Sequence, residues 1–169
     1  MNKNTSTPAW YVFYCKSRTE KKLGENLEQK GFSIFLPLVK TKRVWSDRIK
    51  EVALPLFPNY IFVYCTSAQV PNILSFSHIV GAVRQNGQWA VLREQEKVQI
   101  EQVLSAGIPF ELEDIQIEEG DLVEISAGAL KGIQGRVLRH QGTTRVAITL
   151  DVLNKSIMVA VPWTEIRKL

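Results

Sequence analysis

The side chains best suited to catalysis or metal binding are too scattered along the chain to indicate a site. The two cysteines, Cys15 and Cys65, lie far apart, and the sequence contains no CxxC or HxxxH pair. His78 and His140 have no partner at a spacing typical of metal ligands. No nucleophile with a base and an orienting group stands out, which argues against an enzyme and against a metal or other cofactor. Each cysteine ends an aromatic-rich apolar run, so two buried free thiols are expected.

Basic side chains are concentrated in one part of the chain and suggest a different chemistry, the binding of phosphate. The net charge of the 169 residues is only +4. Between Lys16 and Lys50, however, ten basic residues accompany four acidic ones, whereas from residue 111 onward nine acidic residues accompany seven basic ones. A basic region of this kind attracts nucleic-acid backbones. Composition alone leaves open the alternative of an ordinary solvated surface.

The overall composition is that of a folded protein with one or two small domains. Hydrophobic residues make up 45% of the chain and charged residues 22%. Residues 1–9 are polar, are expected to be disordered, and lack the apolar core of a signal peptide. No apolar run approaches the ~20 residues that a membrane crossing requires, so a cytoplasmic protein with no membrane contact is expected.

Periodic patterns in the front half predict the scaffold that positions these groups. The expected elements are a strand over 10–15, a helix over 18–30, a strand over 32–36, a basic hairpin over 40–50, a strand over 60–64, a short helix over 69–75, a hairpin over 80–92 and a helix over 93–104. Ser17 and Glu20 have the spacing of a capping box for the first helix, and Gly31 suits its left-handed C-cap. Asn86-Gly87 is a favoured hairpin turn.

The back half begins with an acidic segment and then becomes rich in β-branched residues. Six acidic and no basic residues lie between 111 and 121, and the segment 108–117 is interpreted as a linker. Strands are expected at 121–125, 136–139, 144–150 and 155–161. Four or five short strands in so few residues indicate a small barrel. The predicted fold class is α+β: an N-terminal antiparallel sheet flanked by helices, a linker and a C-terminal SH3-like β-barrel.

Four glycines mark the beginning of this barrel. Gly120, Gly128, Gly132 and Gly135 lie in a stretch whose spacing excludes a Rossmann or P-loop motif, because a strand and not a helix follows. Gly128 and Gly132 suit backbone angles that other residues avoid, and Gly135 suits the start of a bent strand. The stretch resembles the KOW motif of NusG-family factors and of several ribosomal proteins.

The front half resembles the NGN domain of the same family. The similarity lies in Trp10-Tyr-Val, in the helix from Arg18, and in Leu56-Phe-Pro-Asn-Tyr-Ile-Phe-Val63. The implied organisation is an NGN-like domain over 9–107, a linker over 108–117 and a KOW barrel over 118–169. The closest match is the RfaH-like branch, which includes capsule-locus factors, and it implies antitermination in specific operons.

The resemblance implies that the N-terminal domain binds the clamp helices of the RNA polymerase β′ subunit. In the family an apolar concave face makes this contact. The residues at the corresponding positions are Tyr14, Phe57, Pro58, Tyr60 and Phe62, with Trp10 in support. Aromatic side chains suit such a contact because they bury a large area with few rotatable bonds. Trp10 and Phe62 can equally be core residues, and the interpretation requires Phe57 and Tyr60 to be accessible.

The resemblance also implies that the strand-to-helix junction binds the non-template DNA strand. The positions concerned are Lys16, Arg18, Thr19, Lys22 and Asn26. Basic groups attract phosphates and an amide can bond a base edge. Asn26 replaces an RfaH-type histidine, so the DNA element is expected to differ. Residues 69–73 lack the His-Thr-Thr run that reaches the polymerase β subunit, and a contact there stays open.

The implied mechanism is non-enzymatic: the N-terminal domain favours the closed state of the polymerase clamp and thereby disfavours paused states of the polymerase. The KOW barrel is expected to recruit ribosomal protein S10 or termination factor Rho, with S10 favoured, and the protein is expected to be a monomer. Some RfaH-like proteins refold this domain as helices, but the β-branched back half predicts a stable barrel. A stand-alone module that binds nucleic acid or ribosomes through KOW is the alternative hypothesis.

Overall fold

The computed structural model describes residues 7–115, 120–140 and 143–169, which form two compact units. The first unit comprises residues 1–94 and the second residues 95–169. The expected disorder of residues 1–9 concerns mainly residues outside the described ranges, although Ala9 already begins a strand. Within the described residues no helix is long and apolar enough to span a membrane.

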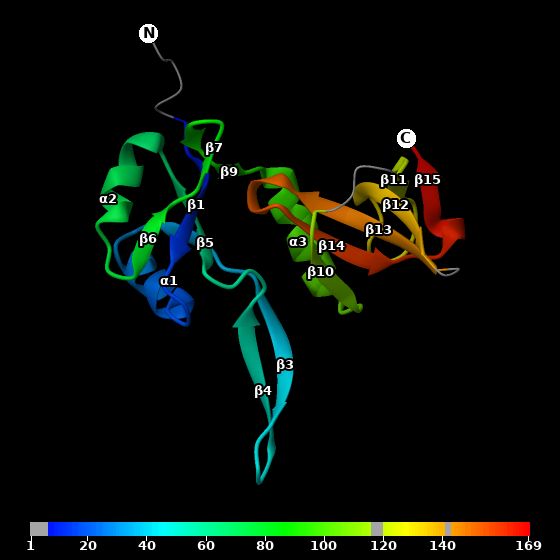
Figure 1. The fold of residues 1–169 in the computed structure, drawn as a ribbon, viewed down its shortest axis with the longest axis horizontal. Helices are drawn as coiled ribbons and strands as arrows, with labels where there is room; N and C mark the ends of the chain where they lie inside the picture. The colour runs from blue at the N-terminus through cyan, green and yellow to red at the C-terminus, as the bar shows by residue number, and fades with distance from the viewer. Residues whose placement is uncertain (1–6, 116–119, 141–142) are drawn as a thin grey trace. The chain divides into compact units, whose positions relative to one another are not determined.

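The N-terminal unit is built on an antiparallel sheet (Figure 1). Its elements are β1 (Ala9–Cys15), α1 (Glu20–Gln29), β2 (Ser33–Phe35), β3 (Leu38–Val44), β4 (Ile49–Pro55), β5 (Tyr60–Cys65), α2 (Val70–Leu74), β6 (Ile79–Ala82), β7 (Arg84–Gln85), β8 (Gln88–Trp89) and β9 (Val91–Leu92). The strand order is β2-β5-β1-β6, and β9 also pairs with β1. Most strands and helices expected in this half are confirmed, with small shifts at their ends. The hairpin expected over 80–92 is limited to β7 and β8, because β6 and β9 pair with β1 and not with each other.

One face of the sheet packs against α1 and α2 to form the core of the unit. Tyr11 and Phe13 of β1 contribute to it, and Ile61 and Val63 do so from β5. Leu23 and Leu27, four residues apart on α1, cover this face and are fully buried. Because side chains alternate along a strand, the residues between these positions point to the opposite face.

The start of α1 differs from the predicted capping box. The helix begins at Glu20 with Thr19 as N-cap, and no side chain caps it. The Thr19 hydroxyl instead donates backward to the Lys16 carbonyl over 2.6 Å. The Glu20 carboxylate is also engaged elsewhere, since it accepts the Asn59 backbone N–H over 2.9 Å. The predicted left-handed residue after the helix is confirmed, because Gly31 has φ +87°.

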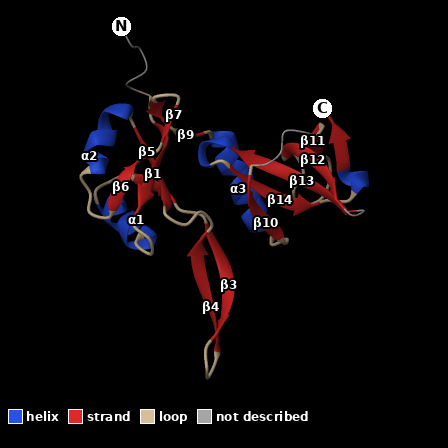
Figure 2. Cartoon of the chain, viewed as in Figure 1, coloured by secondary structure: helices blue, strands red, loops and turns tan. Residues whose placement is uncertain are grey.

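A two-stranded hairpin of β3 and β4 extends from the N-terminal unit, as expected (Figures 1 and 2). Val44 pairs with Ile49, and the Trp45 N–H donates to the Arg48 carbonyl over 2.8 Å to close the tip. Every residue from 40 to 51 is exposed. The hairpin therefore contributes no side chain to a core.

The second unit is a barrel-like sheet with one helix. Its elements are α3 (Glu94–Ala106), whose first residue belongs to the first unit, β10 (Phe110–Asp114), β11 (Leu122–Ile125), β12 (Gln134–His140), β13 (Thr143–Leu150), β14 (Lys155–Ala160) and β15 (Ile166–Lys168). The sheet order is β10-β14-β13-β12-β11-β15, with antiparallel pairing. The α+β fold class and the β form of the back half are confirmed.

The boundary between the units differs from the expected linker at 108–117. Residues 110–114 form β10, which pairs along its length with β14. Its acidic side chains lie beside basic ones on neighbouring strands: Glu111 is 2.8 Å from Arg145, and Asp114 is 2.5 Å from Lys155. The acidic run thus matches charges within the second unit, whereas residues 116 and 117 fall outside the described ranges.

The helix α3 belongs largely to the second unit instead of ending the first. Ile100 and Val103 on its apolar side are buried. The Gln102 side-chain amide donates to the backbone carbonyls of Ala129 and Lys131 over 3.1 and 3.0 Å. The helix is therefore fastened to the loop between β11 and β12, where Gly128 and Gly132 lie.

Candidate functional site

The second face of the N-terminal sheet is lined with aromatic rings that contact one another in pairs. The ring centroids are separated by 6.1 Å for Trp10 and Phe35, 5.1 Å for Trp10 and Tyr64, 5.7 Å for Phe35 and Phe62, 6.2 Å for Phe57 and Phe62, and 5.4 Å for Tyr14 and Tyr60. Such pairs add about 0.5–1.5 kcal/mol each beyond their area burial. We call these residues the aromatic face.

The centre of the aromatic face is buried, which corrects part of the expected contact set. Phe62 has an exposed fraction of 0% and Phe57 of 3%, so neither offers a surface to a partner. Phe57 packs edge-on against Phe62 and belongs to the core. Because Phe57 is next to Pro58, we expected it to be exposed. Its ring instead points into the unit, toward Phe62.

Accessible aromatic and proline groups remain at one end of this face. Tyr14 is 41% exposed, Pro58 is exposed and Tyr60 is half-buried. Tyr14 and Tyr60 are opposite each other in the pairing of β1 with β5. We call these three residues the Tyr14 surface. Of the residues predicted to contact RNA polymerase along this face, they are the ones that a partner can reach at this end.

Trp10 lies at the other end of the aromatic face and is half-buried. Its indole N–H donates to the Glu94 carboxylate over 2.8 Å, and its ring contacts Tyr64. This placement fits the supporting role expected for Trp10. Tyr64 is 42% exposed and was not predicted, although its alternation with Phe62 and Tyr60 along β5 places it on the same face.

A set of polar contacts fixes the turn that carries Pro58. Asn59 adopts the left-handed region with φ +71°. Its backbone N–H donates to Glu20, its side-chain amide donates to the Cys15 carbonyl over 3.3 Å, and its own carbonyl accepts the Cys15 N–H over 2.8 Å. Glu20 is 5% exposed and holds this turn against α1. Sequence reasoning assigned Glu20 to a helix cap and missed this role.

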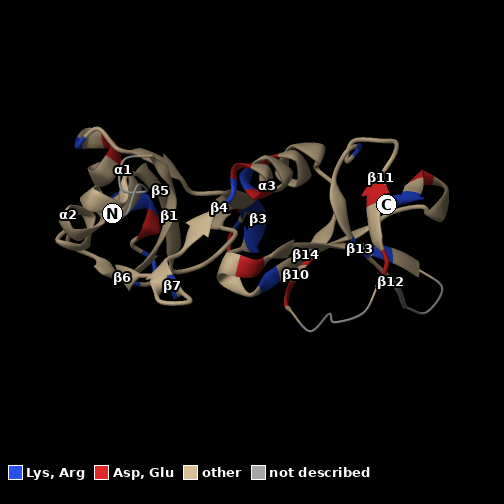
Figure 3. Ribbon diagram, turned by 90° about the horizontal axis from the view of Figure 1, so that it is seen from above, with Lys and Arg blue, Asp and Glu red and all other residues tan. Residues whose placement is uncertain are grey.

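The residues predicted to bind DNA gather around the junction of β1 and α1. Lys16, Arg18 and Lys22 are exposed, whereas Thr19 and Asn26 are half-buried. The Thr19 hydroxyl already donates to the Lys16 carbonyl, so its hydrogen is not free to donate to a base. Arg18 has φ +63°, a conformation that costs a non-glycine residue about 1–2 kcal/mol. Basic residues also lie along β3, where Figure 3 shows them in blue.

The buried thiols behave as expected for core residues. Cys15 and Cys65 are free and have exposed fractions of 0% and 2%. Burial raises the pKa of Cys15 from 9.0 to about 11, with a further contribution from the Glu20 charge. Burial alone raises the pKa of Cys65 to about 11. In the described part of the chain, no cluster of three or more His, Cys, Asp or Glu residues is placed to hold a metal ion.

The predicted glycines of the barrel have identifiable mechanical roles. Gly120, Gly128 and Gly132 adopt positive φ angles of 141°, 75° and 90°. Gly135 does not, but a Cβ there would come within 2.4 Å of the Ala147 carbonyl oxygen. A glycine is therefore required at position 135, because β12 and β13 approach closely there. The sequence had suggested a glycine-dependent bend at this point of β12.

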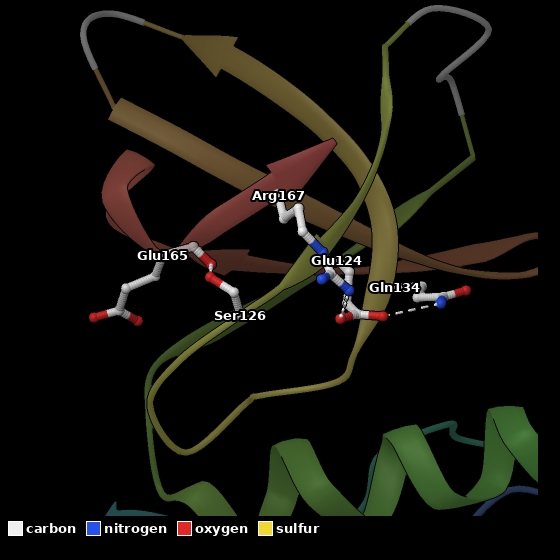
Figure 4. A network of polar contacts seen from close by, with 5 residues as sticks. All are labelled: Glu124, Ser126, Gln134, Glu165 and Arg167. Atoms are coloured by element: carbon white, nitrogen blue, oxygen red, sulfur yellow. Dashed lines mark hydrogen bonds and ion pairs between the residues drawn. The ribbon is translucent and has the colours of Figure 1, made fainter. Parts of the chain in front are cut away.

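Polar contacts connect β11, which precedes the loop with Gly128 and Gly132, to the strands beside it (Figure 4). Arg167 donates to one oxygen of Glu124 over 2.8 Å, and Gln134 donates to the other over 3.3 Å. The Ser126 hydroxyl donates to the Glu165 backbone carbonyl over 3.0 Å. The Arg167–Glu124 contact joins the edge strand β15 to β11, and the Gln134–Glu124 bond joins β12 to β11.

The chain is similar to known proteins over nearly its whole length. A family model described as transcription termination factor NusG matches residues 8–101. NusG of Streptococcus pyogenes is 26% identical over 95% of this chain and 96% of its own length. Transcription elongation factor Spt5 of Sulfolobus acidocaldarius is 25% identical over 81% of this chain and 87% of its own.

A solved structure of Thermotoga maritima NusG is similar in fold. It has a TM-score of 0.52 and 20% identity, and the alignment covers 98% of this chain and 99% of that one. The family model covers more than half of the chain, including the aromatic face and the junction of β1 with α1. The chain therefore belongs to the NusG family of transcription termination factors.

Proposed function

We propose that this protein is an elongation factor that binds RNA polymerase through the Tyr14 surface and reduces pausing or termination in specific operons. NusG-family members are transcription factors and not enzymes, so the activity to explain is binding. The observation that carries the proposal is the accessible group of Tyr14, Pro58 and Tyr60 on a rigid sheet. We assign its partner as the clamp helices of the β′ subunit.

The arrangement supports this assignment because it combines exposed anchors with a fixed base. Tyr14 and Tyr60 contact each other at 5.4 Å, and Glu20 fixes the turn at Asn59 beside them. Side chains that are already ordered lose little conformational entropy on binding. Phe57, Phe62 and Trp10 act from beneath as supports, and their proposed role is to hold the anchors in place.

The junction of β1 and α1 would bind the non-template DNA strand next to the polymerase. Lys16, Arg18 and Lys22 supply exposed positive charge, and the half-buried Asn26 offers an amide for a base edge. Thr19 contributes by fixing the Lys16 carbonyl rather than by contacting DNA. Replacement of the RfaH-type histidine by Asn26 favours a different DNA element from that of RfaH.

The proposed mechanism is a shift between two states of the polymerase. Binding to the clamp favours elongation only if the affinity for the active state exceeds that for the paused state. A factor with equal affinity for both would change neither pausing nor termination. The barrel would recruit a second partner, ribosomal protein S10 or Rho, and S10 is favoured if the chain belongs to the RfaH-like branch.

Retention of core RNA polymerase by the immobilised full-length protein tests the proposal. Tyr60→Ala removes a central anchor and is expected to weaken retention by roughly ten- to thirtyfold, equivalent to about 1.4–2 kcal/mol. Phe57→Ala is unsuitable because it would open a core cavity. Val80→Ala, an exposed position on β6, is the matched control and should retain polymerase normally.

The accessible basic surface of Lys16, Arg18 and Lys22 favours one second candidate function, the binding of nucleic acid without polymerase. If the wild-type protein retains RNA or ribosomes but no polymerase, a stand-alone nucleic-acid-binding module replaces the elongation factor. Transcription on candidate leader templates, with and without the protein, then gives the sign of its effect on pausing and its dependence on DNA sequence.

A further inference from the structure

A cavity in the N-terminal unit lies between the start of α1, the base of the β3–β4 hairpin and Pro58. Its volume is about 370 Å³. The charged groups in its lining include Arg18, Lys21 and Arg43, and Leu54, Pro55 and Pro58 form an apolar wall. We call it the hairpin-base cavity. Pockets for small organic ligands typically measure about 300–1,000 Å³, so its size suits one small molecule or one unit of a polymer.

Two of the three cations that line the hairpin-base cavity are available to a ligand. Lys21 donates to the Ala53 carbonyl over 2.5 Å and thereby fastens α1 to the base of the hairpin. Arg18 and Arg43 are exposed, and across residues 7–115, 120–140 and 143–169 no acceptor pairs with either guanidinium. They come from different elements, so both can approach one anion.

The acidic residue in the lining does not neutralise this pair. Glu20 lines the cavity, but its carboxylate accepts the Asn59 N–H and is 5% exposed. Arg18, Lys21 and Arg43 outnumber this one carboxylate, so the local balance is positive, and planar guanidinium groups match phosphate oxygens well. The anionic part of the ligand is best assigned as a phosphate.

The apolar wall indicates that the ligand also has an apolar part, in addition to its charged group. Leu54 is 37% exposed, and Pro55 and Pro58 stand beside it in the lining. A flat, weakly polar ring can cover such a wall, whereas inorganic phosphate or a short acidic side chain would leave it in water. A nucleotide combines a phosphate with a flat base in one unit of suitable size.

We propose that the hairpin-base cavity binds a single nucleotide, with its phosphate between Arg18 and Arg43 and its base against Leu54 and Pro55. The inference rests on the proposed function, because it adds a base-holding pocket to the basic surface assigned to single-stranded DNA. It also assigns the base of the hairpin a role in binding nucleic acid.

Fluorescence anisotropy with the full-length chain tests the inference. The two probes are a short labelled single strand of DNA and a labelled mononucleotide. Arg43→Ala removes one guanidinium, and Ala53→Phe fills the cavity without changing the charge. Arg43→Ala is expected to weaken binding of the single strand about tenfold, the usual effect of losing one charge-assisted contact. Ala53→Phe should weaken it about as much, because the phenyl ring takes the space of the base. Arg48→Ala is the matched control, since it removes the same charge from the same hairpin outside the cavity lining.

The outcomes separate this inference from the function on which it rests. If Arg43→Ala and Arg48→Ala weaken binding equally and Ala53→Phe has no effect, only diffuse charge is involved and the inference is overturned. If Lys22→Ala weakens binding while both cavity variants do not, the DNA surface stands and the cavity fails alone. If no variant weakens it, both fail.

Two further results concern the identity of the ligand. Mononucleotide binding that is sensitive to Arg43→Ala and Ala53→Phe supports the inference with a free nucleotide as the source. If Ala53→Phe binds both probes normally but no longer retains polymerase, the inference is overturned. The cavity would then receive a side chain of the polymerase and not a nucleotide. Thermal unfolding of each variant provides the check on folding.

Discussion

At Gly135 the barrel has no space for a side chain. A Cβ there would approach the Ala147 carbonyl oxygen to 2.4 Å and Val146 Cγ1 to 2.8 Å, and neither neighbour is the end of a flexible chain. Gly132 is different, since its φ of +90° disfavours other residues but nothing lies within 4 Å of its Cβ position. The first glycine is required for packing and the second for backbone conformation.

Two alanine substitutions should separate these requirements. Gly135→Ala is expected to destabilise the second unit by about 3 kcal/mol or more, because strand backbones must move apart. Gly132→Ala should cost about 1–2 kcal/mol, the strain of a left-handed residue. Urea unfolding followed by circular dichroism measures both. Equal losses of stability would contradict the distinction.

At the scale of elements, the β3–β4 hairpin is long, and beyond its base its side chains are all free of the core. Residues 40–51 are exposed, including Val44 at 82% and Ile49 at 68%. Exposed apolar side chains at the tip add nothing to folding.

Replacing Val44 to Ile49 with Asn-Gly should leave the fold intact. Arg43 pairs with Lys50, two positions from the bonded pair of Trp45 and Arg48, so a two-residue turn can join these positions without a change of register. The free energy of unfolding is expected to change by less than about 0.5 kcal/mol, as for most surface changes. Leu23→Ala, a core position on α1, should by contrast cost about 2–5 kcal/mol. Loss of the folded state in the shortened hairpin would show that the hairpin stabilises the unit.

Across the whole molecule, the two units differ in how their stability should respond to alkaline pH. Both cysteines lie in the first unit. Burial raises the pKa of each thiol from 9.0 to about 11, so the folded state favours the neutral form. This contribution is complete below pH 9.0 and is lost as the pH rises toward about 11, up to roughly 2–3 kcal/mol for each thiol.

The Cys15→Ala, Cys65→Ala double variant isolates this effect. Urea unfolding at pH values below and above 9.0 should show a steeper loss of stability for the first unit of the wild type than for that of the variant. The second unit should respond identically in both proteins. Parallel slopes for the first unit would mean that the thiols ionise without penalty and are not buried in solution.

The sequence alone determined the elements whose causes are local. A β-branched and aromatic run predicted β1, alternation predicted β2, the spacing of Leu23 and Leu27 predicted α1, and Asn86-Gly87 predicted its hairpin. The left-handed glycines were also predictable, because φ depends mainly on the residue and its immediate neighbours. The α+β order of elements and the family resemblance followed from the same patterns.

Only the tertiary structure decided which of these side chains remain accessible. Alternation places Phe62 on the aromatic face, but it does not indicate that Phe62 and Phe57 are covered while Tyr14 is not. Glu20 was assigned to a cap, yet it bonds Asn59, which is 39 residues away. The segment with Glu111 was assigned to a linker and is a strand matched by Arg145. Burial and charge pairing depend on partners distant in sequence, and a local pattern contains no information about them.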